Sequence, residues 1–383
     1  MMTPFDTSKL DRLLEKAGAD LLLTVSKHNI QYLLGGYRYF FFAHGDAFAT
    51  DRYLPILGYV PDKLEQAFYV GAGNEAWGLE VHRIWPPNIV TRSWTSIDAA
   101  ATAAELIRKL GIDARRIAVE FSFLPADAME VFRRELPDAK FIAAFPVLEE
   151  LRAVKNQQEL RHIKDGAAAI VDAMLATFRS GSPGLTEAEL VERLRIEQSQ
   201  RGLIFDYALV TSGLKFGRAP SSRPWSSGEV LSLDTAGYRH GYLADMARMA
   251  VLGQPTQLMQ DLLDEIRFVQ DQARVAVAPG RVGNEVYQAG YAAIEKCKFG
   301  KSFGFVAHGM GLISHEAPRL RHNDEIGYEG AYAERPLEPG MVLSIETGIK
   351  HPQAGFVKLE DTLAVTESGW EAYGDWGRSW NQV

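Results

Sequence analysis

The sequence predicts an α+β protein of two domains, and three observations support this prediction. The chain has 383 residues, whereas a single domain typically has about 150. Helical and extended patterns alternate through residues 1–150, which is typical of an α/β layer. Farther along, long amphipathic helices are followed by strand patterns that contain acidic residues.

The N-terminal domain, expected at residues 1–150, is predicted to be the smaller, α/β part. Gly111 closes one of its helices, because glycine is favoured just after a helix C-terminus. A loop rich in glycine and aromatic residues is expected at 35–46. The predicted helices are 8–17, 100–111 and 124–136, and the predicted strands lie within 19–26, 53–60, 66–71, 115–121 and 140–145.

The C-terminal domain, expected at residues 151–383, begins with a polar, helix-prone segment that continues into an amphipathic helix ending near residue 178. The next helix is predicted to start with a capping box formed by Thr186 and Glu189 and to end at Gly202. Further helices are predicted at 256–277 and 282–297, and strands at 341–349 and 355–366.

Composition excludes several classes of function. The net charge is −8 and no basic run is present, so we expect no nucleic-acid partner. Cys297 is the single cysteine, which excludes an internal disulfide and fits a reducing compartment. The first twenty residues lack a signal-peptide pattern, and no run reaches the roughly 18 to 20 apolar residues of a membrane span. The sequence therefore predicts a cytoplasmic protein without a membrane partner.

The stretch LSLDTAGYRHGYLADMAR, residues 231–248, reads as a hairpin that carries two aspartates. If its strands pair around Arg239 and His240, Asp234 lies directly opposite Asp245. Like charges in that position repel each other, so a positive group is expected between them. A proton or a metal ion would serve.

Two glutamates and two histidines extend this pattern. Glu346 and Glu360 lie in the middle of strand patterns, where glutamate is disfavoured. GFVAHGMGLISHEAPR contains His308 and His315 among glycines, so that one imidazole can ligate a metal ion while the other lies nearby. Two aspartates, two glutamates and a histidine form a hard, oxygen-rich set. Such a set suits two divalent ions, such as Mn²⁺, Co²⁺, Fe²⁺ or Zn²⁺, that share a bridging water.

The order of these motifs resembles the creatinase, aminopeptidase P and prolidase superfamily, and Xaa-Pro dipeptidases (prolidases) most of all. The aspartates are eleven residues apart, the histidines of HGMGLISHE are seven apart, and PGMVLSIETG and LEDT follow. The resemblance implies a C-terminal pita-bread metallopeptidase domain. The preceding residues, including SKHNIQYLLGGY, resemble the N-terminal domain of prolidases and creatinase.

The resemblance also implies roles for individual residues. Asp245 and Glu360 would bridge the two ions. Glu346 would take a proton from the bridging water as general base, and His315 would stabilise the tetrahedral intermediate. The implied metal ligands are Asp234, Asp245, His308, Glu346 and Glu360. Creatinase works without metal and does not keep this full set.

The chain departs from the peptidase pattern around the substrate. Gly217 and Gly304 stand where histidines are usual, Lys358 where an arginine is common, and Ala247 where a threonine is usual. The substrate-binding candidates are Arg319, Lys358, Tyr242 and Arg38. Arg38 belongs to the aromatic run YRYFFF, residues 37–42, where family dimers send a loop toward the neighbouring active site. A creatinase-like guanidine-binding arginine would fall near Ala43, which disfavours creatine as substrate.

Three functions follow from these observations. The first is a metallopeptidase acting on Xaa-Pro dipeptides or similar small peptides, as a homodimer. The second keeps the metal centre but hydrolyses a non-peptide amide or cyclic amidine, as an ectoine-hydrolase-like or creatinase-like enzyme would. The third is a non-catalytic binding protein on the same fold, which the complete ligand set disfavours.

Overall fold

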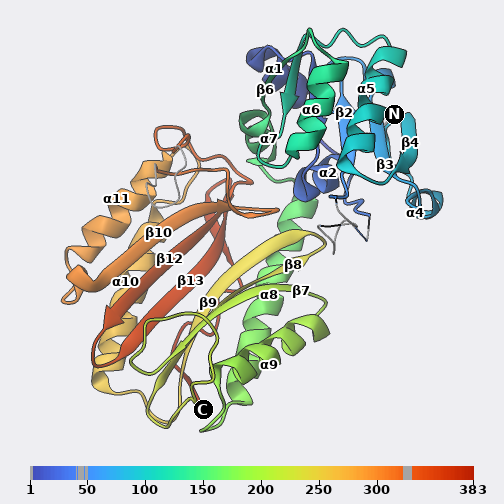
Figure 1. Ribbon diagram of the computed structural model, residues 1–383. Coiled ribbons are helices and arrows are strands. Elements are labelled where there is room, and N and C mark those ends of the chain that lie inside the picture. Colours follow the sequence, from blue (N-terminus) through green and yellow to red (C-terminus); the bar gives the residue numbers. More distant parts are fainter. Residues whose placement is uncertain (1–2, 40, 42–46, 48–50, 322–329) are drawn as a thin grey trace. The chain divides into compact units, whose positions relative to one another are not determined.

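The structure, a computed structural model, describes residues 3–39, 41, 47, 51–321 and 330–383. The chain divides into two compact units, Met1–Leu151 and Arg152–Val383 (Figure 1). Each unit has its own sheet and its own hydrophobic clusters. Within the part of the chain that is described, no helix combines the length and the apolar character needed to cross a bilayer.

The first unit contains a mixed sheet with helices on both faces. Among the described residues its strand order is β4-β3-β2-β1-β5-β6, and β2 runs antiparallel to both of its neighbours. The strands are β1 (Leu21–Thr24), β2 (Ile56–Tyr59), β3 (Phe68–Ala72), β4 (Asn88–Ser93), β5 (Arg116–Val119) and β6 (Lys140–Ala143). The helices are α1 (Thr7–Ala17), α2 (Lys27–Leu33), α4 (Ala76–Val81), α5 (Ser96–Lys109), α6 (Ala126–Glu135) and α7 (Phe145–Arg152), with a 3₁₀ turn at Leu64–Gln66.

Burial on both faces explains why β1 is apolar throughout. Leu21 packs with Ala103 and Phe132 of the helices α5 and α6, whereas Leu22 packs with Leu14 of α1. Successive strand residues point to opposite faces, so a strand between two helix layers has no polar side. The sequence patterns missed α2, α4 and β4, which are short or carry many exposed residues.

The second unit contains a larger, almost wholly antiparallel sheet. Its strand order is β11-β10-β12-β13-β9-β8-β7, with β14 beside β13 and β15 beside β9. The strands are β7 (Ile204–Ser212), β8 (Val230–Arg239), β9 (Tyr242–Val251), β10 (Phe303–Met310), β11 (Ser314–Glu316), β12 (Val342–His351), β13 (Gly355–Thr366), β14 (Gly369–Tyr373) and β15 (Asn381–Gln382). The helices are α8 (Gln157–Arg179), α9 (Glu187–Gln200), α10 (Gln257–Val275) and α11 (Gly283–Ile294), with a 3₁₀ turn at Gly300–Ser302.

Alternation along the strands separates a helix-covered face from a polar one. Leu343 and Ile345 of β12 pack in a cluster with α10 and α11, and Leu233 of β8 packs with α8. Alternate residues therefore project to the opposite face, among them Glu346 and Asp234. We call this second surface the carboxylate face (Figure 1, yellow to red strands).

The β8–β9 hairpin corrects the predicted register. Asp234 is paired with Ala247, and Asp245 with Ala236, so the two aspartates are diagonal neighbours and do not lie directly opposite each other. The turn consists of His240 and Gly241, whose φ angles of 50° and 82° are both positive, as a two-residue type I′ turn requires. The prediction centred the turn one residue too early. The carboxylates still share one face.

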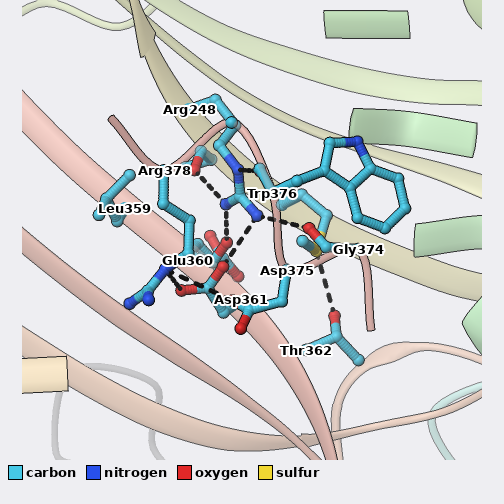
Figure 2. A network of polar contacts seen from close by, with 12 residues as sticks. Arg248, Leu359, Glu360, Asp361, Thr362, Gly374, Asp375, Trp376 and Arg378 are labelled. Atoms are coloured by element: carbon cyan, nitrogen blue, oxygen red, sulfur yellow. Dashed lines mark hydrogen bonds and ion pairs between the residues drawn. The ribbon is translucent and has the colours of Figure 1, made fainter. Parts of the chain in front are cut away.

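A buried network on the helix-covered face joins β9 to β13 (Figure 2). Arg248 is fully buried and donates to the carbonyl oxygens of Ala247 and Glu360, both at 2.8 Å. Its guanidinium also lies 2.9 Å from Asp361, which in turn contacts Arg274 at 2.7 Å. Arg378 is a third cation on Asp361, at 3.2 Å. These contacts hold the two strands together directly behind the carboxylate face.

We expect Asp361→Asn to lower the free energy of unfolding of the metal-free protein by about 3 kcal/mol or more, because buried guanidinium groups would lose their shared carboxylate. The control is Asp271→Asn, whose side chain is half exposed and lies 3.3 Å from Arg378; it should cost at most about 1 kcal/mol. Urea denaturation in a chelator measures both. Equal losses in the two variants would contradict a structural role for the buried network.

Candidate metal centre

Strand pairing brings all five predicted metal ligands onto the carboxylate face. Glu346 of β12 and Glu360 of β13 lie directly opposite each other, and Glu360 pairs with Ala247 of β9 on its other side. His308 of β10 pairs with Ser344, two residues before Glu346. The predicted ligands therefore come from five strands: Asp234 (β8), Asp245 (β9), His308 (β10), Glu346 (β12) and Glu360 (β13).

His308 is fully buried and directs one ring nitrogen toward two carboxylates. Its Nδ1 lies 3.0 Å from the Gly309 carbonyl oxygen, which places the ring hydrogen on Nδ1. Its Nε2 lies 3.2 Å from Glu346 Oε1 and 3.7 Å from Glu360 Oε1, without hydrogen-bond geometry to either. Burial alone would lower the pKa of His308, but these carboxylates raise it to about 10. The ring of the metal-free protein therefore carries a second proton, on Nε2, near pH 7. A metal ion bound at Nε2 would replace that second proton.

His315 stacks on His308. The ring centroids are 3.9 Å apart and the planes are inclined by 17°. His315 has a φ of 57°, an uncommon value for a residue other than glycine. Burial and the neighbouring charge of His308 lower the pKa of His315 to about 4. Its imidazole is therefore neutral near pH 7.

Lys358 lies among the acidic side chains. Its Nζ donates to Asp234 and, at 2.6 Å, to Glu346, and it lies 2.9 Å from Glu360. Burial alone would lower the pKa of Lys358, but attraction to these three carboxylates raises it well above its ordinary value. Arg218 is a second cation on Asp234 and also packs over the Phe356 ring.

Among the described residues, no cation forms an ion pair with Asp245. The Tyr207 hydroxyl donates to Asp245 Oδ2 at 2.6 Å, and Oδ1 has no hydrogen-bond partner among the described residues. Burial raises the pKa of Asp245 well above its ordinary value, and the charges of Glu360 and Asp234 raise it further. Ser344 Oγ, which donates to Glu360 at 2.8 Å, completes the polar shell.

Comparison with known families gives this geometry its context. Residues 161–367 match metallopeptidase family M24, and residues 7–154 match the creatinase/prolidase N-terminal domain. The chain belongs to metallopeptidase family M24. As an M24 protein it is a metal-dependent hydrolase, as its sequence predicted.

Similar proteins match this chain over most of its length. The chain is 26% identical to the uncharacterized peptidase YqhT of Bacillus subtilis. The match extends over 373 residues and covers 94% of this chain and 95% of YqhT. The chain is also 26% identical to the Xaa-Pro dipeptidase of Pyrococcus horikoshii, over 74% of this chain and 77% of that one. The solved structure of the Xaa-Pro dipeptidase from Bacillus anthracis has a TM-score of 0.82 at 22% identity, covering 98% and 99% of the two chains. The predicted pita-bread domain and its creatinase-type N-terminal domain are confirmed.

The M24 site residues fit a divalent metal ion. Asp245 Oδ1 and His308 Nε2 are buried atoms that lack a hydrogen-bond partner within the described residues, and a metal ion would provide one. Two groups have donor atoms within 4.8 Å of one another: His308, His315 and Glu346, and Asp234, Glu346 and Glu360. The first contains imidazoles and a carboxylate, and the second is all carboxylate, which are donors that Mn²⁺, Fe²⁺, Co²⁺ and Zn²⁺ accept.

The predicted substrate-binding residues lie in different places. Tyr242 donates from its hydroxyl to Glu159 of α8 at 2.9 Å. Arg38 belongs to the first unit, where it donates to Gln31 at 3.4 Å. Arg319 is buried three residues after Glu316, and Lys358 contacts the acidic side chains. Of the YRYFFF run, Phe40 and Phe42 lie outside the described residues, as does Ala43. Substrate binding by these residues stays a prediction.

Sequence reasoning missed part of the polar shell. Tyr207 lies on β7, a strand that the sequence patterns did not predict, so nothing indicated that its hydroxyl reaches Asp245. Arg248 gave no signal either, because an arginine in a strand pattern usually faces solvent. Asp361 follows Glu360 directly in LEDT. A second acidic residue in the middle of a buried strand was the one sequence signal that a buried cation lies behind the sheet.

The metal-free protein should lose stability as the pH rises from about 6.5 to 10, because the folded pKa of His308 is above the unfolded value. The stabilisation is complete below the unfolded pKa and is lost as the pH passes through the folded one. Urea denaturation in a chelator at several pH values should give a steeper decline for the unmodified protein than for His308→Gln. Parallel curves would contradict the assigned pKa.

Proposed function

We propose that the chain hydrolyses the amide bond of small peptides, with Xaa-Pro dipeptides as the first substrate class. The observation that carries this proposal is the convergence of four carboxylates, His308 and His315 on one sheet face. The Xaa-Pro dipeptidases among the relatives support it. We further propose two divalent ions, Mn²⁺ first, with Asp234, Asp245, His308, Glu346 and Glu360 as ligands, and a homodimer, which sedimentation tests.

The metal ions would supply Lewis-acid activation of water and of the scissile carbonyl. Glu346 is assigned as proton acceptor. Burial alone would raise its pKa, but Lys358 and His308 hold the pKa below the ordinary range, so the carboxylate is ionised. His315 is assigned as hydrogen-bond donor to the developing oxyanion, a role that suits a neutral imidazole beside the ligand histidine.

A second substrate class has an observation in its favour. An added Cβ at Gly217 would meet no atom within 4 Å, and at Gly304 it would meet only the Gly348 carbonyl oxygen, at 4.0 Å. Space is therefore open at the two positions where the resemblance implies histidines. Both glycines are exposed, and the lack of histidines at these positions favours a substrate other than an Xaa-Pro dipeptide, such as a non-peptide amide or cyclic amidine.

Proline release from a panel of Xaa-Pro dipeptides by Mn²⁺-loaded protein tests the first class. We expect release that chelation abolishes and Mn²⁺ restores, with Asp245→Ala as the blank. If the loaded protein releases no proline, the peptide proposal fails, and the same assay with small non-peptide amides tests the second class.

Two substitutions test the assigned roles. Glu346→Gln keeps the shape of the side chain but cannot accept a proton, so kcat should fall by about 10² to 10⁴.

His315→Ala removes the oxyanion donor and should lower kcat by about 10² to 10³, with a smaller effect on KM. Unchanged kcat in either variant, measured at equal metal content, would remove that residue from the mechanism.

A further inference from the structure

Glu346 and Glu360 each present two oxygens to two different neighbours. Their Oε1 atoms face His308 Nε2, at 3.2 Å and 3.7 Å. Their Oε2 atoms face Lys358 Nζ, at 2.6 Å and 2.9 Å. The paired glutamates thus divide the centre into a His308 side and a Lys358 side.

The two sides differ in what they offer to a cation. On the His308 side, Nε2 is a buried nitrogen that can ligate a metal ion and that makes no hydrogen bond to either glutamate. On the Lys358 side, one ammonium already contacts every member of the group formed by Asp234, Glu346 and Glu360. Arg218 adds a second positive charge on Asp234. On the Lys358 side, the chain itself therefore already supplies two positive charges to three carboxylates.

A divalent ion and the lysine ammonium cannot use the same oxygens at the same time. Both would need Glu346 Oε2 and Glu360 Oε2, and two cations that close repel each other strongly in a buried site. Lysine suits such an exchange, because its ammonium is a compact charge on a flexible stem that can be withdrawn. An ion entering this side must displace Lys358 first.

We propose that Lys358 is an internal counter-ion that competes with one of the two divalent ions, so that the centre binds its ions in two separate steps. The first ion binds on the His308 side. The second binds only when the ammonium leaves Asp234, Glu346 and Glu360. This inference rests on the proposed function only in taking these side chains as metal ligands.

Calorimetric titration of the chelator-stripped protein with Mn²⁺ tests the proposal, together with metal analysis after dialysis. The unmodified protein should retain one ion per chain and bind the second at least tenfold more weakly. In Lys358→Gln the second ion should bind at least tenfold more tightly than in the unmodified protein. Two ions of equal affinity in the unmodified protein, or a second affinity that Lys358→Gln leaves unchanged, would overturn the proposal.

Two further variants control for the charge and for folding. Lys164→Gln removes an exposed lysine that pairs with Glu371 on the same unit, and it should bind Mn²⁺ as the unmodified protein does. Lys358→Arg keeps a positive charge and should keep the two-step binding. If Lys358→Gln does not fold, simultaneous tight binding of two ions by Lys358→Arg still overturns the proposal.

Peptide hydrolysis is measured separately, so the two proposals fail separately. Two-step binding without proline release would end the peptide proposal and leave the counter-ion role in place. Proline release by a protein that binds both ions equally tightly would end the counter-ion role alone.

Discussion

Repulsion among three buried carboxylates and the partly buried Glu346 is the constraint on which the second unit depends. Two like charges 4 Å apart repel each other by about 4 kcal/mol even at an effective dielectric constant of 20. The chain offsets this unevenly: Asp234 contacts two cations, Glu346 and Glu360 contact one lysine and one histidine, and Asp245 has a tyrosine hydroxyl. Even so, burial raises the pKa of Asp234 to about 6. A metal ion would therefore relieve repulsion that the protein's own cations leave behind.

The backbone holds the carboxylates in place against this repulsion. Arg248 spans β9 and β13 on the helix-covered face by binding the carbonyl oxygens of Ala247 and Glu360, two residues that are paired across the strands (Figure 2). The Arg248 side chain, bound to one main-chain carbonyl of each strand, thus fixes the distance between the strands that carry Asp245 and Glu360. Asp361 neutralises the Arg248 guanidinium. The ion pair on the helix-covered face thus stabilises the two strands whose other face carries the mutually repelling carboxylates.

Local patterns predicted much of the fold, because buried helices and strands repeat with fixed periods. The capping box at Thr186 and the apolar strand β1 are examples. The motif order was enough to predict the family and a set of acidic and histidine side chains that share one face. The hairpin register was wrong because a single residue decided it, the positive φ of His240. The contact of Lys358 with Asp234 could not be predicted, since the two residues are 124 positions apart and meet only in the assembled sheet. Glu360, by contrast, lies two residues beyond Lys358 on the same face of β13.

Glu316 links β11, the strand that carries His315, to the first residues of the second unit. Its buried carboxylate lies 3.0 Å from Lys155 and 3.4 Å from Arg152, and Lys155 also donates to the Ala317 carbonyl oxygen at 3.2 Å. These two cations precede α8, in the segment that the sequence predicts to be polar and helix-prone, and they contact the carboxylate that follows His315 directly. A catalytic unit produced without the N-terminal domain must therefore begin before Arg152. One that starts at the first residue of α8 would leave a buried carboxylate without its cations beside His315.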